Sequence, residues 1–173
     1  MEAILNRRSV RKYTTQAVPE EYITEILEAG MSAPSAGNER PWHFIVVTER
    51  SLLDGIIEFH GYAQMLEQAP VAIVVCADPA CNKYPGVNYW ALDCAAATQN
   101  ILLAAYNKGL GTCWVSIYPR EDRIEAIGRL LDLPKHIVAI SVVALGYPLE
   151  ANRPRRSRYD SQRVHRNGWQ SGL

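Results

Sequence analysis

The stretch VNYWALDCAAATQNILLAAYNKGLGTCW, residues 87–114, decides the fold because it predicts one long helix that needs cover on most of its sides. Asn88 is a candidate cap at its start, and Gly109 is a typical residue for its end. The apolar residues between them fall all round the helical cylinder, which is typical of a helix enclosed by protein. The small residues 95–97 would let another backbone come close. The stretch therefore predicts either the core helix of one chain or a helix that crosses a copy of itself in a dimer.

The rest of the composition indicates one globular domain over residues 1–173. Of the 173 residues, 48% are hydrophobic and 21% are charged, so the chain can bury a sizeable core. The start, MEAILNRRSVRKY, lacks the apolar run of a signal peptide, and the best apolar run, residues 137–145, is too short to span a bilayer. The four cysteines never occur as Cys-x-x-Cys, which favours reduced thiols over a metal site. We therefore expect a cytoplasmic protein with no membrane partner.

Positive charge gathers near the end of the chain. The net charge is zero, yet residues 153–166 hold six arginines and a single acid, Asp160. No aromatic stacking module or helix-turn-helix accompanies these arginines, so nucleic acid is not the expected partner. A small phosphorylated ligand, or acidic groups on another subunit, fits better. Because apolar periodicity ends near Gly146, we expect residues 147–173 to form an extended tail that is disordered or lies across something already folded.

Four β-branched or aromatic runs predict strands, at residues 42–48, 71–77, 111–117 and 138–145. The segments between them predict helices, and this alternation on its own favours a parallel α/β sheet. We expect the strand at residues 42–48 to be buried. Its His43 is then expected to be a hydrogen-bonded core side chain.

Two segments are rich in groups that bind anions or polar rings. The run RRSVRK, residues 7–12, combines arginine forks with a serine hydroxyl, a set that suits phosphate oxygens. The loop PSAGNERP, residues 34–41, carries a hydroxyl, a carboxamide and backbone amides that could bind a polar heterocycle. Taken alone, the first segment is more typical of a solvated surface and the second of a plain connection.

The order of these motifs resembles the FMN-dependent nitroreductase family over essentially the whole chain. The resemblance is carried by RRSVR at 7–11, PSAGN at 34–38 followed by PWHF at 41–44, GLG at 109–111, GYP at 146–148 and VHRNGW at 164–169. It implies an α+β fold in which helices flank a central, mostly antiparallel sheet, so it overrules the parallel sheet that the alternation suggests. It also implies an intertwined homodimer with two FMN sites at the subunit interface and residues 147–173 packed on the partner subunit.

The resemblance also implies which residues hold FMN. Arg7 and Ser9 would bind the phosphate, with Arg8 close by. Arg11 would lie at the pyrimidine edge of the flavin, where a cation stabilises the reduced, anionic ring. The loop at residues 34–38 would reach the FMN that is held mainly by the other subunit.

Further candidates lie in the middle and the tail of the chain. Gln64 would face the pyrimidine, and a turn near Ser116 could present a backbone amide to flavin N5. In the tail, Arg156 and Arg158 best match a basic pair that closes over the phosphate, with Arg155 as a rival to Arg156. No acid–base catalytic residue and no metal ligand is expected. The cofactor-binding candidates are Arg7, Arg8, Ser9, Arg11, Pro34, Ser35, Ala36, Asn38, Gln64, Ser116, Arg156 and Arg158.

By this resemblance the protein would be an FMN-dependent oxidoreductase. It would pass electrons from NADH or NADPH to a nitroaromatic, a quinone or a similar small-molecule acceptor by a ping-pong mechanism. The alternatives are a specialised member that dehalogenates reductively or breaks down a flavin, with Tyr62 or Tyr118 as substrate contacts, and a non-enzymatic FMN-binding or storage protein. Arg40, where many relatives carry Gln, and the short segment at residues 78–87 leave the preferred acceptor open.

Overall fold

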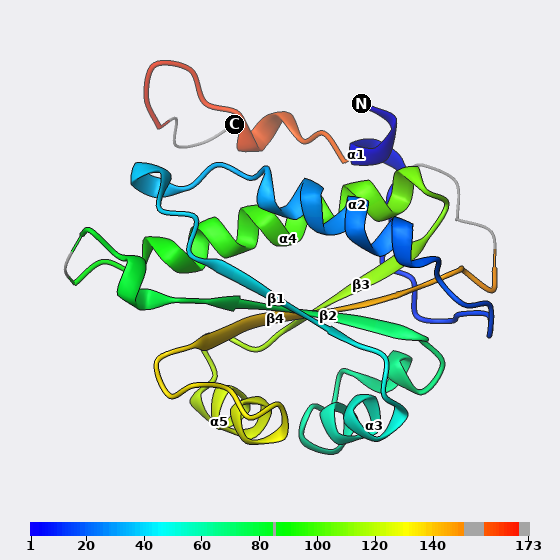
Figure 1. The fold of residues 1–173 in the computed structure, drawn as a ribbon. Coiled ribbons are helices and arrows are strands. Elements are labelled where there is room, and N and C mark those ends of the chain that lie inside the picture. The colour runs from blue at the N-terminus through cyan, green and yellow to red at the C-terminus, as the bar shows by residue number, and fades with distance from the viewer. Residues whose placement is uncertain (85, 151–157, 170–173) are drawn as a thin grey trace.

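A four-stranded antiparallel sheet forms the centre of the computed structural model, which describes residues 1–84, 86–150 and 158–169 (Figure 1). Its strands lie in the order β1 (Trp42–Val47), β2 (Val71–Ala77), β4 (Val138–Gly146) and β3 (Gly111–Ser116). Each neighbouring pair is antiparallel, which confirms the α+β class. The alternation of strands and helices suggested a parallel sheet, and this expectation is wrong. The end of β1 pairs with the start of β2, so the segment between them begins and ends at the same edge of the sheet and the two strands run in opposite directions.

Helices cover both faces of the sheet (Figure 1). The helices α2 (Glu20–Met31) and α4 (Tyr89–Asn107) lie on one face, and α3 (Arg50–Phe59) and α5 (Glu121–Leu130) lie on the other. Because successive strand residues point to opposite faces, each strand contributes to both apolar cores. Short elements complete the described structure: α1 (Glu2–Asn6) and single 3-10 turns at Ala36–Asn38, Gln64–Glu67, Pro79–Cys81 and Ser161–Arg163.

Within the described part of the chain, α4 buries one face and leaves apolar side chains on another. Its buried residues face the sheet and α2, whereas Leu92 is 67% exposed. Gly109 ends the helix as predicted, with φ of 74°, and the next N–H, of Leu110, donates to the carbonyl of Ala105 at 2.9 Å. Asn88 occupies the N-cap position, but its side chain makes no capping hydrogen bond; its amide nitrogen donates to the Tyr118 hydroxyl at 3.4 Å. The long helix is therefore not enclosed on every side by its own chain.

The strand β1 lies at the edge of the sheet, so the prediction of a buried strand is wrong. Trp42 and Val47 are buried, but the residues between them are exposed or half-buried. His43 is exposed and is not a core side chain. Because successive strand residues alternate, His43 points to the face opposite to the one on which Trp42 packs. At the edge of the sheet, fewer side chains cover this opposite face. The central positions belong to β2 and β4, whose residues are buried almost throughout.

The N-terminal segment, residues 7–13, runs along the outer edge of β3. Ser9 bridges Thr112, and the N–H of Val10 donates to the Thr112 carbonyl at 2.9 Å. Gly111 permits this close approach, because a Cβ there would lie 2.7 Å from the Val10 side chain. The basic run is therefore held against a strand of the sheet.

Candidate functional site

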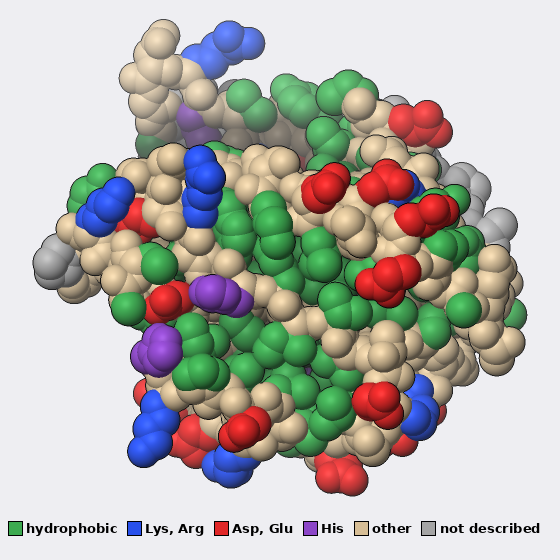
Figure 2. Space-filling view, viewed as in Figure 1, with side chains coloured by type: hydrophobic (Ala, Val, Ile, Leu, Met, Phe, Trp, Pro, Cys, Tyr) green, Lys and Arg blue, Asp and Glu red, His purple; other side chains and the backbone are tan. Residues whose placement is uncertain are grey.

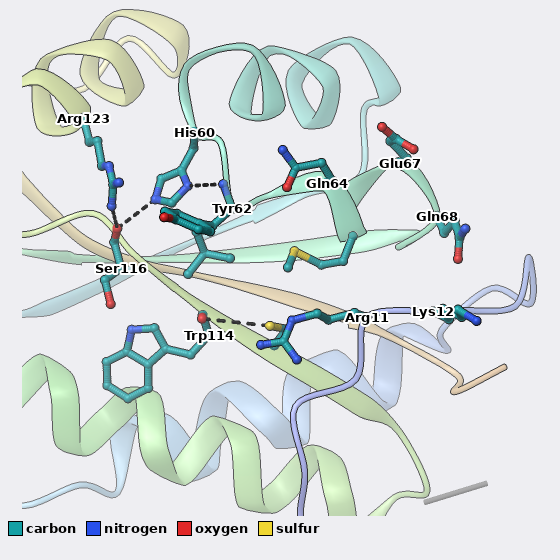
Figure 3. A pocket seen from close by; sticks show the side chains of 13 residues that line it. Arg11, Lys12, His60, Tyr62, Gln64, Glu67, Gln68, Trp114, Ser116 and Arg123 are labelled. Carbon is teal, nitrogen blue, oxygen red and sulfur yellow. Dashed lines mark hydrogen bonds between the residues drawn. The ribbon is translucent and has the colours of Figure 1, made fainter. Parts of the chain in front are cut away.

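A cavity of about 670 Å³ opens beside β3, within the usual size range of small-molecule sites. The N-terminal segment forms one wall, residues 60–68 form the opposite wall, and the start of α5 lies at one end (Figure 3). The residues that line it are Arg11, Lys12, His60, Tyr62, Gln64, Met65, Glu67, Gln68, Cys113, Trp114, Val115, Ser116 and Arg123.

A hydrogen-bonded histidine fixes one wall of the cavity to the end of β3. The Tyr62 N–H donates to His60 Nδ1 at 3.3 Å, so His60 carries its proton on Nε2 and donates it to the Ser116 carbonyl at 2.9 Å. Arg123 Nη1 donates to the same carbonyl at 3.0 Å. His60 is 2% exposed, whereas the Tyr62 ring is 75% exposed (Figure 3). The network therefore holds an exposed aromatic ring beside the polar end of the strand.

Cations outnumber acids among the residues that line the cavity. Arg11, Lys12 and Arg123 face a single carboxylate, that of Glu67. Lys12 pairs with Glu150 at 2.8 Å, but Arg11 and Arg123 form no ion pair within the described residues. The lining therefore favours a ligand that carries negative charge or several acceptor atoms.

A second cationic group adjoins the cavity and joins the two ends of the chain. Burial lowers the pKa of the half-buried Arg7, and the nearby charges of Arg158 and Arg8 lower it further. Arg7 and Arg11 both act on the thiol of Cys113, which lines the cavity, although burial still raises the pKa of that thiol. None of these arginines pairs with a carboxylate in the described ranges. An anion is the complement that this group lacks.

Arg8 and Ser9 contact neighbouring backbone in this structure. Arg8 Nη1 donates at 2.8 Å to the carbonyls of both Leu5 and Arg7, and thereby caps the end of α1. Ser9 is exposed at the start of the segment beside β3. Of the two neighbouring arginines, Arg7 therefore has more of its guanidinium available to a phosphate.

The loop at residues 34–38 does not line this cavity. Its Ser35 hydroxyl accepts the Arg40 N–H at 3.0 Å, and the Ala36 N–H donates to Asp93 in α4 at 3.0 Å. Pro34 and Asn38 are exposed. Within one chain, the structure thus keeps this loop apart from the pocket that contains Arg11, Gln64 and Ser116.

The structure brings together part of the predicted set and adds residues that the sequence did not single out. Arg11, Gln64 and Ser116 line one cavity, and Arg7 and Arg158 adjoin each other. Arg156 and its rival Arg155 lie outside the described residues. Eight lining residues were missed: His60, Met65, Glu67, Gln68, Cys113, Trp114, Val115 and Arg123. The two-residue alternation of β3 could have placed Trp114 and Ser116 on one face, but nothing in the pattern marks a lone His or Arg.

Within the described residues, no helix is long and apolar enough to cross a membrane. In the same ranges, no cluster of three or more His, Cys, Asp or Glu side chains could hold a metal ion. All four cysteines are free thiols, and Cys81 is the exposed one.

Fold and cavity together define an α+β protein with a cavity of cofactor size, rich in cationic side chains, beside β3 and between its N-terminal segment and residues 60–68. The chain belongs to the Nitroreductase family, whose sequence model matches residues 4–60 and 57–147.

Similar proteins include one from Methanothermobacter thermautotrophicus, provisionally named NADH dehydrogenase/NAD(P)H nitroreductase. It is 52% identical over 169 residues, which cover 98% of this chain and 87% of that protein. A solved structure of a protein with the same provisional name, from Parabacteroides distasonis, has a TM-score of 0.91 and 46% identity, and covers 97% of both chains. An FMN-dependent nitroreductase from Clostridium difficile has a TM-score of 0.88 and 30% identity, and covers 98% of this chain and 100% of its own.

Proposed function

We propose that the protein is an FMN-dependent oxidoreductase that uses NADH or NADPH to reduce small organic acceptors such as nitroaromatics and quinones. The observation that carries the proposal is the cationic group formed by both ends of the chain next to a cavity of cofactor size. Relatives named as NAD(P)H nitroreductases and FMN-dependent nitroreductases support it.

The residues of the site fit FMN in charge and in hydrogen-bonding groups. Arg7, Ser9 and Arg158 would hold the phosphate, which would supply the anion that these arginines lack. Arg11 and Gln64 would hold the pyrimidine edge, where Arg11 places a positive charge. When bound, FMN supplies a ring that accepts a hydride from the nicotinamide and then passes electrons to the acceptor, which gives ping-pong kinetics.

We further propose that the protein is an intertwined homodimer. The apolar face of α4 with the exposed Leu92 suits a second copy, since exposed apolar patches mark interaction surfaces. The loop at residues 34–38 lies away from its own cavity, and in a dimer it would reach the cavity of the partner. The described tail residues 158–169 are almost all exposed and project above the rest of the surface (Figure 2), so they would pack on the partner.

The test is anaerobic reduction of the FMN-saturated protein by NADH and by NADPH, followed by stopped-flow absorbance. We expect one or both donors to bleach the flavin absorbance, and a quinone or nitroarene to restore it. Initial rates against both substrates should give parallel double-reciprocal lines. If neither donor reduces bound FMN within a physiological turnover time, the oxidoreductase proposal is wrong and cofactor storage becomes the better account.

A further inference from the structure

The buried ring of His60 connects two groups at one side of the cavity beside β3. Its Nδ1 accepts the Tyr62 N–H at 3.3 Å, and its Nε2 donates to the Ser116 carbonyl at 2.9 Å. Arg123 Nη1 donates to the same carbonyl at 3.0 Å. One continuous series of hydrogen bonds therefore joins the backbone that carries the Tyr62 ring to the guanidinium of Arg123.

The Tyr62 side chain is an aromatic surface that the described part of the chain leaves largely uncovered. The residue lines the cavity and is 75% exposed. Its ring makes a T-shaped contact with the His60 ring, with 6.3 Å between the two centroids. Aromatic rings bind other planar rings through stacked or edge-to-face contacts. The Tyr62 ring is therefore suited to contact a planar ligand at the wall of the cavity.

Arg123 adds a positive charge that its surroundings leave unpaired. It is half-buried in the first turn of α5, and within the described residues it forms no ion pair. The acids beside it in α5 lie outside the lining of the cavity, and two of them pair with Arg120 and Arg129. The bond to the Ser116 carbonyl uses one of the five N–H groups of the guanidinium. The others are available to a ligand.

These groups lie apart from the residues proposed to hold the pyrimidine edge of FMN. Figure 3 shows Arg123 and Ser116 toward one side of the cavity, and Arg11 and Glu67 toward the other. Glu67 is the carboxylate of the lining, so it does not neutralise Arg123. The contacts proposed for FMN through Arg11 and Gln64 therefore leave the Arg123 side to a second ligand.

We propose that Tyr62 and Arg123 form an acceptor subsite that selects aromatic carboxylates. The ring of the substrate would contact Tyr62, and its carboxylate would bind the guanidinium of Arg123, whose planar fork matches the two oxygens. That the occupant is the electron acceptor rests on the proposed function. With a nitrobenzoate as acceptor, NADH or NADPH and one proton convert the nitro group to a nitroso group and water. The carboxylate itself is unchanged by the reaction.

The first experiment measures binding without turnover, by fluorine NMR of para-fluorobenzoate and para-fluorobenzamide with the full chain, in the presence and absence of FMN. Neither compound carries a nitro group, so neither is a substrate. The carboxylate should bind about tenfold more tightly than the amide, the value of roughly one charge-assisted hydrogen bond. Equal affinities in the wild-type protein would overturn the proposal.

Two substitutions at Arg123 separate its charge from its bond to the Ser116 carbonyl. Arg123→Gln should remove the difference between the two ligands, because the amide still has an N–H for the carbonyl but carries no charge. Arg123→Lys should keep part of the difference, since it retains the charge without the planar fork. A preference for the carboxylate that survives in Arg123→Gln would show that another cation binds it, and the proposal would be wrong.

Substitution of Tyr62 tests the aromatic part of the subsite. Tyr62→Ala should weaken the carboxylate and the amide by a similar factor, about two- to tenfold, because both lose the same ring contact. Tyr62→Phe keeps the ring and should bind both ligands nearly as the wild type does. Unchanged affinities in Tyr62→Ala would remove this ring from the subsite and overturn the proposal.

The second experiment measures kcat/KM for para-nitrobenzoate and para-nitrobenzamide in the FMN-saturated protein. The ratio of the two values should be about tenfold higher in the wild type than in Arg123→Gln, with the change mainly in KM. Comparing ratios between proteins cancels the different reactivities of the two nitro groups. Arg129→Gln, at an exposed residue of α5 that pairs with Glu125, is the matched control and should keep the wild-type ratio. The same ratio in Arg123→Gln and wild type would contradict the proposal.

The two experiments separate this proposal from the proposed function. If neither NADH nor NADPH reduces bound FMN, the proposed function is wrong, while the fluorine NMR still decides whether Arg123 binds a carboxylate. If Arg123→Gln changes the preference between NADH and NADPH but not the acceptor ratio, Arg123 binds the additional phosphate of NADPH. The acceptor subsite is then wrong and the proposed function stands.

Discussion

The N-terminal segment beside β3 and the Ser35–Arg40 loop solve opposite problems. The first gathers arginines that no described carboxylate neutralises, in an extended backbone that pairs with a strand. The second has left-handed backbone that the carboxylates of Asp93 and Glu39 hold in place. The N-terminal segment is suited to bind an anion through its charge, and the loop is suited to bind a ligand through the direction of its backbone groups. Unpaired cations and left-handed backbone both lower local stability, and such features are typical of functional sites.

In the proposed dimer, the Ser35–Arg40 loop of one subunit meets the N-terminal segment of the other. The largest expected effect comes from a substitution that prevents the dimer from forming and so separates the two regions. Leu92→Glu places a charge on the apolar face of α4, where Leu92 is 67% exposed, so the folded chain should tolerate it. Burying that charge at an interface is costly, so we expect monomers by sedimentation and an FMN affinity reduced by at least about 100-fold. Leu92→Met is the matched control. A Leu92→Glu protein that stays dimeric with normal FMN affinity would contradict the proposed interface.

The next effect tests the charged region alone. Arg7→Ala removes a cation with no described carboxylate partner, and should weaken FMN binding about 10- to 100-fold, the value of a charge-assisted phosphate contact. Riboflavin, which has no phosphate, should bind the variant and the wild type alike. Arg129→Ala, at an exposed residue of α5 that pairs with Glu125 at 3.6 Å, should change neither affinity. Equal losses for FMN and riboflavin would place Arg7 elsewhere than at the phosphate.

A smaller effect tests how the charged region is held. Gly111→Ala would place a methyl group 2.7 Å from Val10 and push the N-terminal segment off β3. We expect a loss of about 1–3 kcal/mol in the free energy of unfolding, measured by denaturant titration. Gly128→Ala, in α5 with nothing within 4 Å, should instead stabilise by about 0.5–1 kcal/mol. Adding Val10→Gly to Gly111→Ala removes the side chain that the new methyl group meets and should recover part of that loss, and no recovery would show that the loss has another cause.

The same two regions show what the sequence can and cannot predict. Hydrophobic periodicity located all four strands, because it reports local burial. It could not predict strand direction or the edge position of β1, since both depend on where the connecting helices return the chain. The basic run was visible in the sequence. The role of Asp93 was hidden, because a single acid in the apolar run ALDCAAA gives no sign of the N–H that it meets.

The smallest expected effect asks why each region needs a glycine, Gly37 in the loop and Gly111 beside the N-terminal segment: because of backbone conformation or because of lack of space. Gly37 has φ of 56°, so Gly37→Ala should cost about 1 kcal/mol through backbone strain. The Tyr84 hydroxyl, 3.2 Å from the added Cβ, lies at the end of a side chain that can shift, and Gly61→Ala is a control at an open position. Asparagine tolerates the left-handed conformation, so Gly37→Asn should recover part of that loss. At Gly111 the obstacle is the Val10 side chain, so Gly111→Asn should be at least as damaging as Gly111→Ala. If asparagine were equally harmful at both positions, the loop would be limited by space rather than by conformation, and its carboxylate supports would not be needed to maintain strain.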